Sequence, residues 1–142
     1  RTQASFFLPL SILLITQCTR PEEATKFTLS SGSTVVLRRI FETHLGNLRP
    51  GNAGNGEKVL VFEYETRTDI HNLQGMLPEV NDVWTSFKPM VEKQHISYAI
   101  ICAIQKARSK DTPDEAFSKG LMRDADGLWV AGGDELHYWT RF

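Results

Sequence analysis

The 142-residue sequence has only two cysteines and no excess of either charge. Two cysteines cannot form the disulfide framework that stabilises many small secreted domains. Sixteen Lys and Arg against seventeen Asp and Glu give a formal net charge of -1, so no overall field attracts the protein to nucleic acid or to anionic lipid. The hydrophobic share of 41% is enough for one domain, and it excludes collagenous, coiled-coil and wholly disordered chains.

The sequence also lacks the common signatures of enzymes and metal sites. It contains no glycine-rich phosphate loop, no G-x-S-x-G nucleophile elbow and no kinase signature. The histidines show neither an H-x-x-x-H spacing nor an accompanying cysteine pair, so we predict no metal site and no cofactor. The four histidines are His44, His71, His95 and His137.

One acidic segment resembles half of a calcium-binding loop. In Asp124-x-Asp126-Gly127 the carboxylates alternate, and Glu135 stands at the twelfth position, where such loops have a bidentate acid. However, Gly127 is fourth instead of sixth, and Leu128 occupies a position that should carry a ligand. We therefore interpret the segment as a hairpin turn.

A thiol nucleophile is a further hypothesis. Cys102 could pair with His95, with Glu92 or Asp82 orienting the imidazole, as in a Cys/His hydrolase. Yet the apolar stretch Tyr98–Ile104 around Cys102 would raise the pKa of the thiol. A buried, inert cysteine is the favoured interpretation.

No apolar run reaches the roughly 20 residues that a membrane-spanning helix needs. The ten-residue run Phe6–Ile15, broken only by Pro9 and Ser11, instead matches the apolar region of a secretory signal, the alternative being a buried first element of the fold. The following Ile15-Thr16-Gln17-Cys18 resembles a bacterial lipobox, with Gln17 in place of Gly, Ala or Ser. We predict a signal segment over residues 1–17, lipid attachment at Cys18, and a location in the cell envelope or outside the cell. A disulfide between Cys18 and Cys102 is the alternative role of the two thiols.

Residues 18–33 are polar and predict a tether, which places one domain over residues 34–142. Thr34–Phe41 and Lys58–Thr66 are typical of strands that pair as an antiparallel hairpin. The alternation in the second strand places Glu63 and Glu65 on one face, opposite Phe62 and Tyr64. Arg38, Arg39 and Arg141 could form a basic patch, but we expect Arg38 and Arg39 to pair with the two glutamates.

The strongest periodic signal is an apolar stripe at helical spacing from Leu73 to Val91. Because Pro78 and Pro89 each remove a backbone donor, we expect a helix that begins near Pro78 and kinks at Pro89, or two shorter segments.

After this helix the apolar run Ser97–Gln105 predicts a central strand. Thr112-Pro113-Asp114-Glu115 predicts a short helix to Lys119, and two strands follow at Gly127–Ala131 and Leu136–Phe142. The result is an α+β fold, an antiparallel sheet of four to five strands with one long amphipathic helix packed on one face.

Part of this pattern resembles a known group of proteins. Val80-Asn81-Asp82-Val83-Trp84, then Phe87-Lys88-Pro89, Val91-Glu92-Lys93 and the strand Ala99-Ile100-Ile101, are similar to a pattern in short, uncharacterised bacterial secreted proteins and lipoproteins. The resemblance implies an envelope location and an α+β fold. It implies no reaction and no ligand.

The function we expect is that of a lipid-anchored, non-catalytic envelope module. It would contact another envelope protein or a cell-wall component through the exposed side of its sheet, and it would touch the membrane only through its lipid. The alternative is a soluble ligand-binding domain with an aromatic pocket. The residues of that pocket would be Trp84, Trp129, Tyr138 and Trp139.

Overall fold

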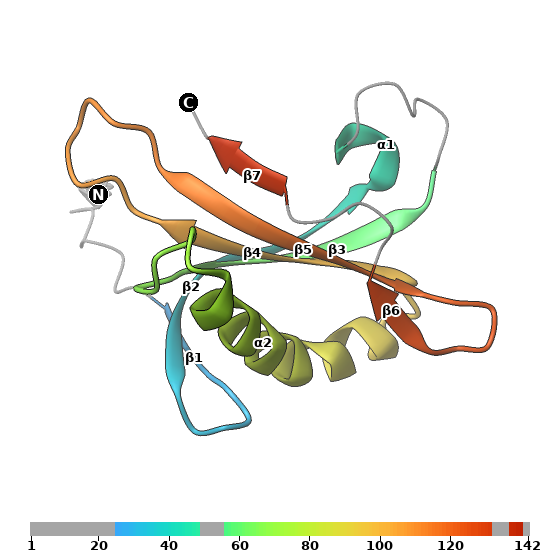
Figure 1. Cartoon of the computed structure of the whole chain (residues 1–142). Coiled ribbons are helices and arrows are strands. Elements are labelled where there is room, and N and C mark those ends of the chain that lie inside the picture. Colours follow the sequence, from blue (N-terminus) through green and yellow to red (C-terminus); the bar gives the residue numbers. More distant parts are fainter. Residues whose placement is uncertain (1–24, 49–55, 132–136, 141–142) are drawn as a thin grey trace, which may run out of the picture.

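The computed structural model describes residues 25–48, 56–131 and 137–140, which form a mixed sheet with a long helix on one side (Figure 1). Six strands follow one another in the order β1-β2-β3-β4-β5-β6, and β7 also pairs with β5. The elements are β1 Thr25–Thr28, β2 Thr34–His44, α1 Leu45–Leu48, β3 Lys58–Glu65, α2 Leu73–Lys93, β4 Tyr98–Gln105, β5 Glu115–Arg123, β6 Trp129–Ala131 and β7 His137–Thr140.

The two central strands of this sheet, β3 and β4, run parallel, in a register from Val59 opposite Tyr98 to Glu65 opposite Ile104. The other pairs are antiparallel. The α+β class is therefore confirmed, but the prediction of a wholly antiparallel sheet with four to five strands is wrong. The physical reason is the crossover: α2 carries the chain back along the sheet, so that β4 starts beside the start of β3.

Helix α2 buries a continuous stripe on one face of the sheet. Its buried residues are Met76, Val80, Val83, Phe87 and Val91, all in the predicted stripe, whereas Leu73 and Leu77 of that stripe are exposed. The ring of Phe87 lies 5.0 Å from that of Phe62 on β3, which also contacts Phe27 and Tyr64. Burial of several large side chains, each contributing about 2 kcal/mol, makes this the main core.

The helix starts earlier than we predicted and is continuous. Asn72 caps it by accepting a hydrogen bond from the Gly75 amide, so that the helix begins five residues before Pro78 and continues through Pro89. Both prolines lie on its exposed side, where the carbonyls that lose a donor can bond to water. No helix in the described part of the chain is long and apolar enough to cross a membrane.

Residues 25–33, predicted as part of a tether, belong to the fold. Thr25–Thr28 pairs with β2, and the turn after it contacts α2. The Ser30 amide donates to Ser86 Oγ at 2.7 Å, and the Ser31 hydroxyl donates to the carboxylate of Asp82. The polar residues that suggested a tether therefore bond to the helix. Residues 18–24 of the predicted tether lie outside the described residues.

The predicted helix from Thr112 to Lys119 is also wrong, because Glu115–Arg123 forms strand β5. Thr112 therefore caps no helix, and the carboxylate of Asp114 accepts from the Ala107 amide at 2.8 Å and from Arg38 at 3.1 Å. Pairing with β4 on one side and with β6 and β7 on the other outweighs the local capping signal.

The last two predicted strands are confirmed at Trp129–Ala131 and His137–Thr140. Between β5 and β6, Asp124 Oδ1 accepts from the amides of Asp126 and Leu128, and Gly127 has a φ of 80°. This is the hairpin turn that we predicted in place of a calcium loop.

Truncation of Phe87 to Ala should test the core. Phe87 is fully buried, so the change should lower the free energy of unfolding by about 3–5 kcal/mol, as measured by urea denaturation. Leu77→Ala on the same helix is the control, since Leu77 is 37% exposed and should cost under about 1 kcal/mol. Equal effects of the two changes would contradict the packing described.

Candidate functional site

A buried carboxylate lies on the sheet face opposite α2. Glu63 is 2% exposed and accepts from Arg39 twice, from Nε at 2.7 Å and from Nη2 at 3.2 Å. The Arg39 guanidinium also lies 4.2 Å from the ring centre of Phe41. Hydrogen bonding to Glu63 raises the pKa of Arg39 above its ordinary value.

A second ion-pair group surrounds Arg38. Its Nε donates to Glu65 Oε1 at 3.2 Å and its Nη2 donates to Asp114 Oδ2 at 3.1 Å, while Lys106 Nζ lies 3.1 Å from the same Glu65 oxygen. The pairing of Arg38 and Arg39 with Glu65 and Glu63 confirms the expectation from the sequence. Adjacent strand residues normally face opposite sides, but an irregular register between Leu37 and Arg39 lets both guanidinium groups reach the same row of glutamates.

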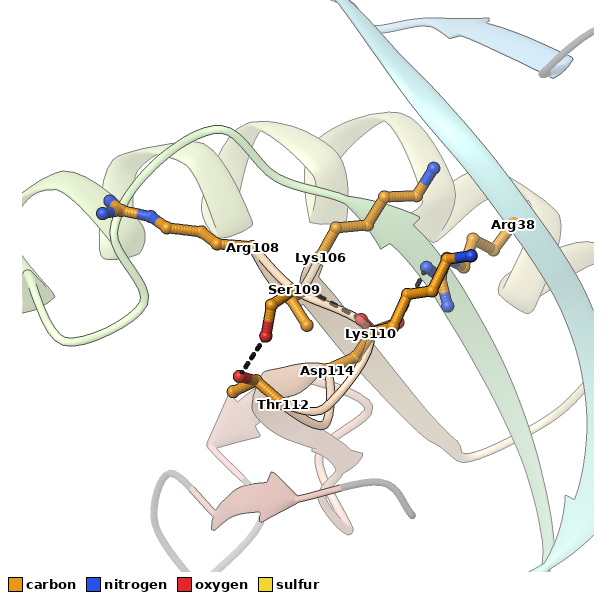
Figure 2. Close-up of a pocket in the computed structure, with 8 residues that line it drawn as sticks. Arg38, Lys106, Arg108, Ser109, Lys110, Thr112 and Asp114 are labelled. Carbon is orange, nitrogen blue, oxygen red and sulfur yellow. Dashed lines mark hydrogen bonds and ion pairs between the residues drawn. The ribbon is translucent and has the colours of Figure 1, made fainter.

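The loop between β4 and β5 forms an open pocket next to Arg38 (Figure 2). Asp114 fixes the shape of the loop, because its carboxylate accepts a hydrogen bond from the Ala107 amide. A second contact within the loop joins the hydroxyls of Ser109 and Thr112, which lie 2.8 Å apart. The backbone hydrogen bond, followed by the pairing with Arg38, lowers the pKa of Asp114. The pocket is lined by Arg38, Lys106, Ala107, Arg108, Ser109, Lys110, Thr112 and Asp114.

The charge of this pocket is positive, with four cations and one carboxylate in its lining. Glu65 and Asp114 compensate Arg38 and Lys106 in part. Arg108 and Lys110 make no ion pair with any described residue. In Figure 2 Lys106 and Lys110 extend toward the side of the Arg38 guanidinium, whereas Arg108 points away. A chain with a net charge of -1 therefore carries a local basic pocket at one end of its sheet.

The aromatic residues proposed as a ligand pocket are only partly brought together. The rings of Trp84 and Trp129 lie 4.9 Å apart in an edge-on arrangement, and Trp129 Nε1 donates to Glu92 Oε1 at 3.0 Å. They pack against the main core, where Trp84 also meets Phe87. The side chains of Tyr138 and Trp139, in β7, lie outside the described residues, as does the lipid-attachment candidate Cys18.

The structure does not place Cys102 and His95 as a catalytic pair. Exposed His95 lies in the turn after α2, with a φ of 55°. Cys102 is buried in β4 on the face opposite α2, roughly 13 Å along the strand from Tyr98. Its buried position agrees with the sequence expectation. Among the residues described, no three His, Cys, Asp or Glu side chains gather where they could hold a metal ion.

Comparisons with known proteins supply no assignment. No protein-family model, curated protein or solved structure matches this chain. The candidate site therefore depends on its own geometry.

The basic pocket is the feature that sequence reasoning missed. The sequence carried one visible signal for it, the alternating cations Lys106, Arg108 and Lys110 that directly follow the strand predicted at Ser97–Gln105. The contribution of Arg38 was not visible, because it depends on the order of β2, β3 and β4 in the sheet.

Replacing Arg39 with Met should expose the role of the buried ion pair. The change leaves the Glu63 carboxylate without its guanidinium partner, and we expect a loss of about 2 kcal/mol in the free energy of unfolding, moderated by the partial exposure of Arg39. Lys58→Met is the matched control, since Lys58 pairs with exposed Glu42 across the same two strands and should cost under about 0.5 kcal/mol. Similar losses in urea denaturation would contradict the assignment.

The effect of Asp114→Asn should depend on pH. Since the folded state lowers the pKa of Asp114, the charged form stabilises the fold above the unfolded pKa of about 4, and this contribution disappears as the pH falls through the folded pKa. The variant should be less stable than the original by about 1 kcal/mol at pH 7, with the gap closing in acid. Urea denaturation across this range measures the gap.

Asp111→Asn is the control for that series. Asp111 is exposed and has no ion pair within the described part of the chain, so its replacement should leave stability within about 0.5 kcal/mol at each pH. A gap for Asp114→Asn that stays constant into strong acid would disprove the electrostatic explanation.

Proposed function

We propose that this chain is an exported, non-catalytic binding module of the cell envelope, anchored by lipid at Cys18. The anchor follows from the apolar run Phe6–Ile15 and the lipobox-like residues after it. The module would work by recognition, through surfaces that the folded domain presents outside its core.

The observation that supports a non-catalytic role is that the buried and partly buried carboxylates form ion pairs within the fold. Glu63 and Arg39 are fixed on each other, and Glu65 and Asp114 are fixed on Arg38. These groups connect strands and shape a loop, which is what a rigid recognition domain needs. A nucleophile and a base would have to meet at hydrogen-bond distance, and the proposed pair of Cys102 and His95 does not offer that geometry.

The aromatic-pocket alternative has weaker support. Trp84 and Trp129 contact each other edge-on, and the indole N–H of Trp129 is already bonded to Glu92. Such rings stabilise the join between α2 and β6. The basic pocket, by contrast, is open, and its residues Arg108 and Lys110 form no ion pair with any described residue.

Replacing Cys18 with Ala should release the protein from membranes. Without the thiol no lipid can be attached, so the full chain should move from the membrane pellet to the supernatant after cell fractionation, and incorporation of labelled fatty acid should stop. Cys102→Ala is the matched control, because this buried cysteine plays no part in anchoring and its variant should stay in the pellet.

Two results would refute the proposal. The Cys18→Ala chain could remain in the membrane pellet, or the original chain could incorporate no fatty acid. Urea denaturation of both variants shows whether either change acts through the fold instead.

A further inference from the structure

We propose that the basic pocket formed by Arg38, Lys106 and Lys110 docks on phosphate groups of anionic lipid headgroups in the membrane that holds the chain. This inference rests on the proposed function, because it takes lipid attachment at Cys18 as given. It goes beyond that function by assigning a ligand to the pocket and an orientation to the anchored domain.

The first argument is the chemistry of the pocket. Lys106 and Lys110 extend to the side of the Arg38 guanidinium (Figure 2), and cations of this kind bind phosphate oxygens through charge-assisted hydrogen bonds. Asp114 adds one negative charge to the lining, but its oxygens are held by the Ala107 amide and by Arg38. Glu65 neutralises part of the charge of Arg38 and Lys106, whereas Lys110 has no partner among the described residues.

The second argument is independent and concerns where the anchor enters the domain. Thr25, the first residue of β1, pairs with Leu37, which directly precedes Arg38 in β2. Cys18 is seven residues before Thr25, and seven residues span at most about 25 Å whatever their conformation. Figure 1 shows the start of β1 and the loop between β4 and β5 on the same side of the molecule. A lipid on Cys18 therefore keeps the pocket close to the membrane surface.

The third argument is the asymmetry of charge. The pocket lining is basic although the chain as a whole has a net charge of -1. An anionic membrane attracts basic side chains only within about a Debye length, near 10 Å, so this local charge acts only if the pocket faces the surface. The tether supplies that proximity.

The experiment measures the reactivity of lysines in the full, lipidated chain. The protein is inserted into vesicles of phosphatidylcholine, either alone or mixed with phosphatidylglycerol, and is treated with an amine-acetylating reagent before mass spectrometry. We expect Lys106 and Lys110 to react at least about fivefold more slowly in the anionic vesicles, and high salt to restore their reactivity. Lys93, at the end of α2 remote from the pocket, is the internal reference and should not change.

A charge reversal provides the matched pair of variants. Lys110→Glu should abolish the slowing at Lys106, whereas Lys93→Glu should leave it intact. Both side chains are exposed and have no ion pair in the described part of the chain, so both variants should keep the fold.

Each of the other outcomes overturns the inference in a distinguishable way. Equal reactivity of the pocket lysines in both kinds of vesicle shows that the pocket does not meet the headgroups, while the anchor at Cys18 stands. If millimolar inorganic phosphate slows Lys106 and Lys110 in neutral vesicles as strongly as phosphatidylglycerol does, the ligand is free phosphate and not a headgroup. If the chain carries no lipid in the fractionation test, the proposed function itself is wrong.

Discussion

The packing of α2 across β3 and β4 is the interaction on which the rest of the structure depends. In this contact the ring of Phe87 packs against the ring of Phe62. Because the helix returns the chain along the sheet, the two central strands run parallel. Because parallel strands end at the same edge, Glu65 at the end of β3 lies beside Lys106, which directly follows β4. The position of the basic pocket is thus a consequence of the hydrophobic core.

The local patterns of the sequence were sufficient for much of this architecture. The stripe of α2 and the alternation of Glu63 and Glu65 depend on helix and strand geometry alone, and both were predicted correctly. The direction of β4 depends on a crossover, and β5 overrides a good capping sequence at Thr112-Pro113 because it gains partners on both sides. Such choices are made by tertiary pairing, which periodicity does not encode.

The candidate site, like the fold, was predictable from the sequence only in part. Pairing of the two arginines with the two glutamates followed from neighbouring strands, as the sequence indicated. The pocket needed more, since it joins a β-strand residue, Arg38, to a loop that follows β4 and to Asp114 before β5. Arg38 lies 76 residues before Asp114, and Asp114 belongs to the same loop as Lys106, so the two parts of the pocket meet only in the assembled sheet.

Burial decides which charges serve the fold and which are available to a ligand. Glu63 has almost no contact with water, so losing Arg39 would remove the guanidinium that pairs with a buried carboxylate. Lys110, exposed on a surface loop, contributes nothing comparable to stability. A cation that forms no ion pair within the fold has little effect on the free energy of unfolding and can bind an external anion. Lys110 is therefore available to a ligand, although Arg38 in the same pocket and the adjacent Arg39 form ion pairs between strands.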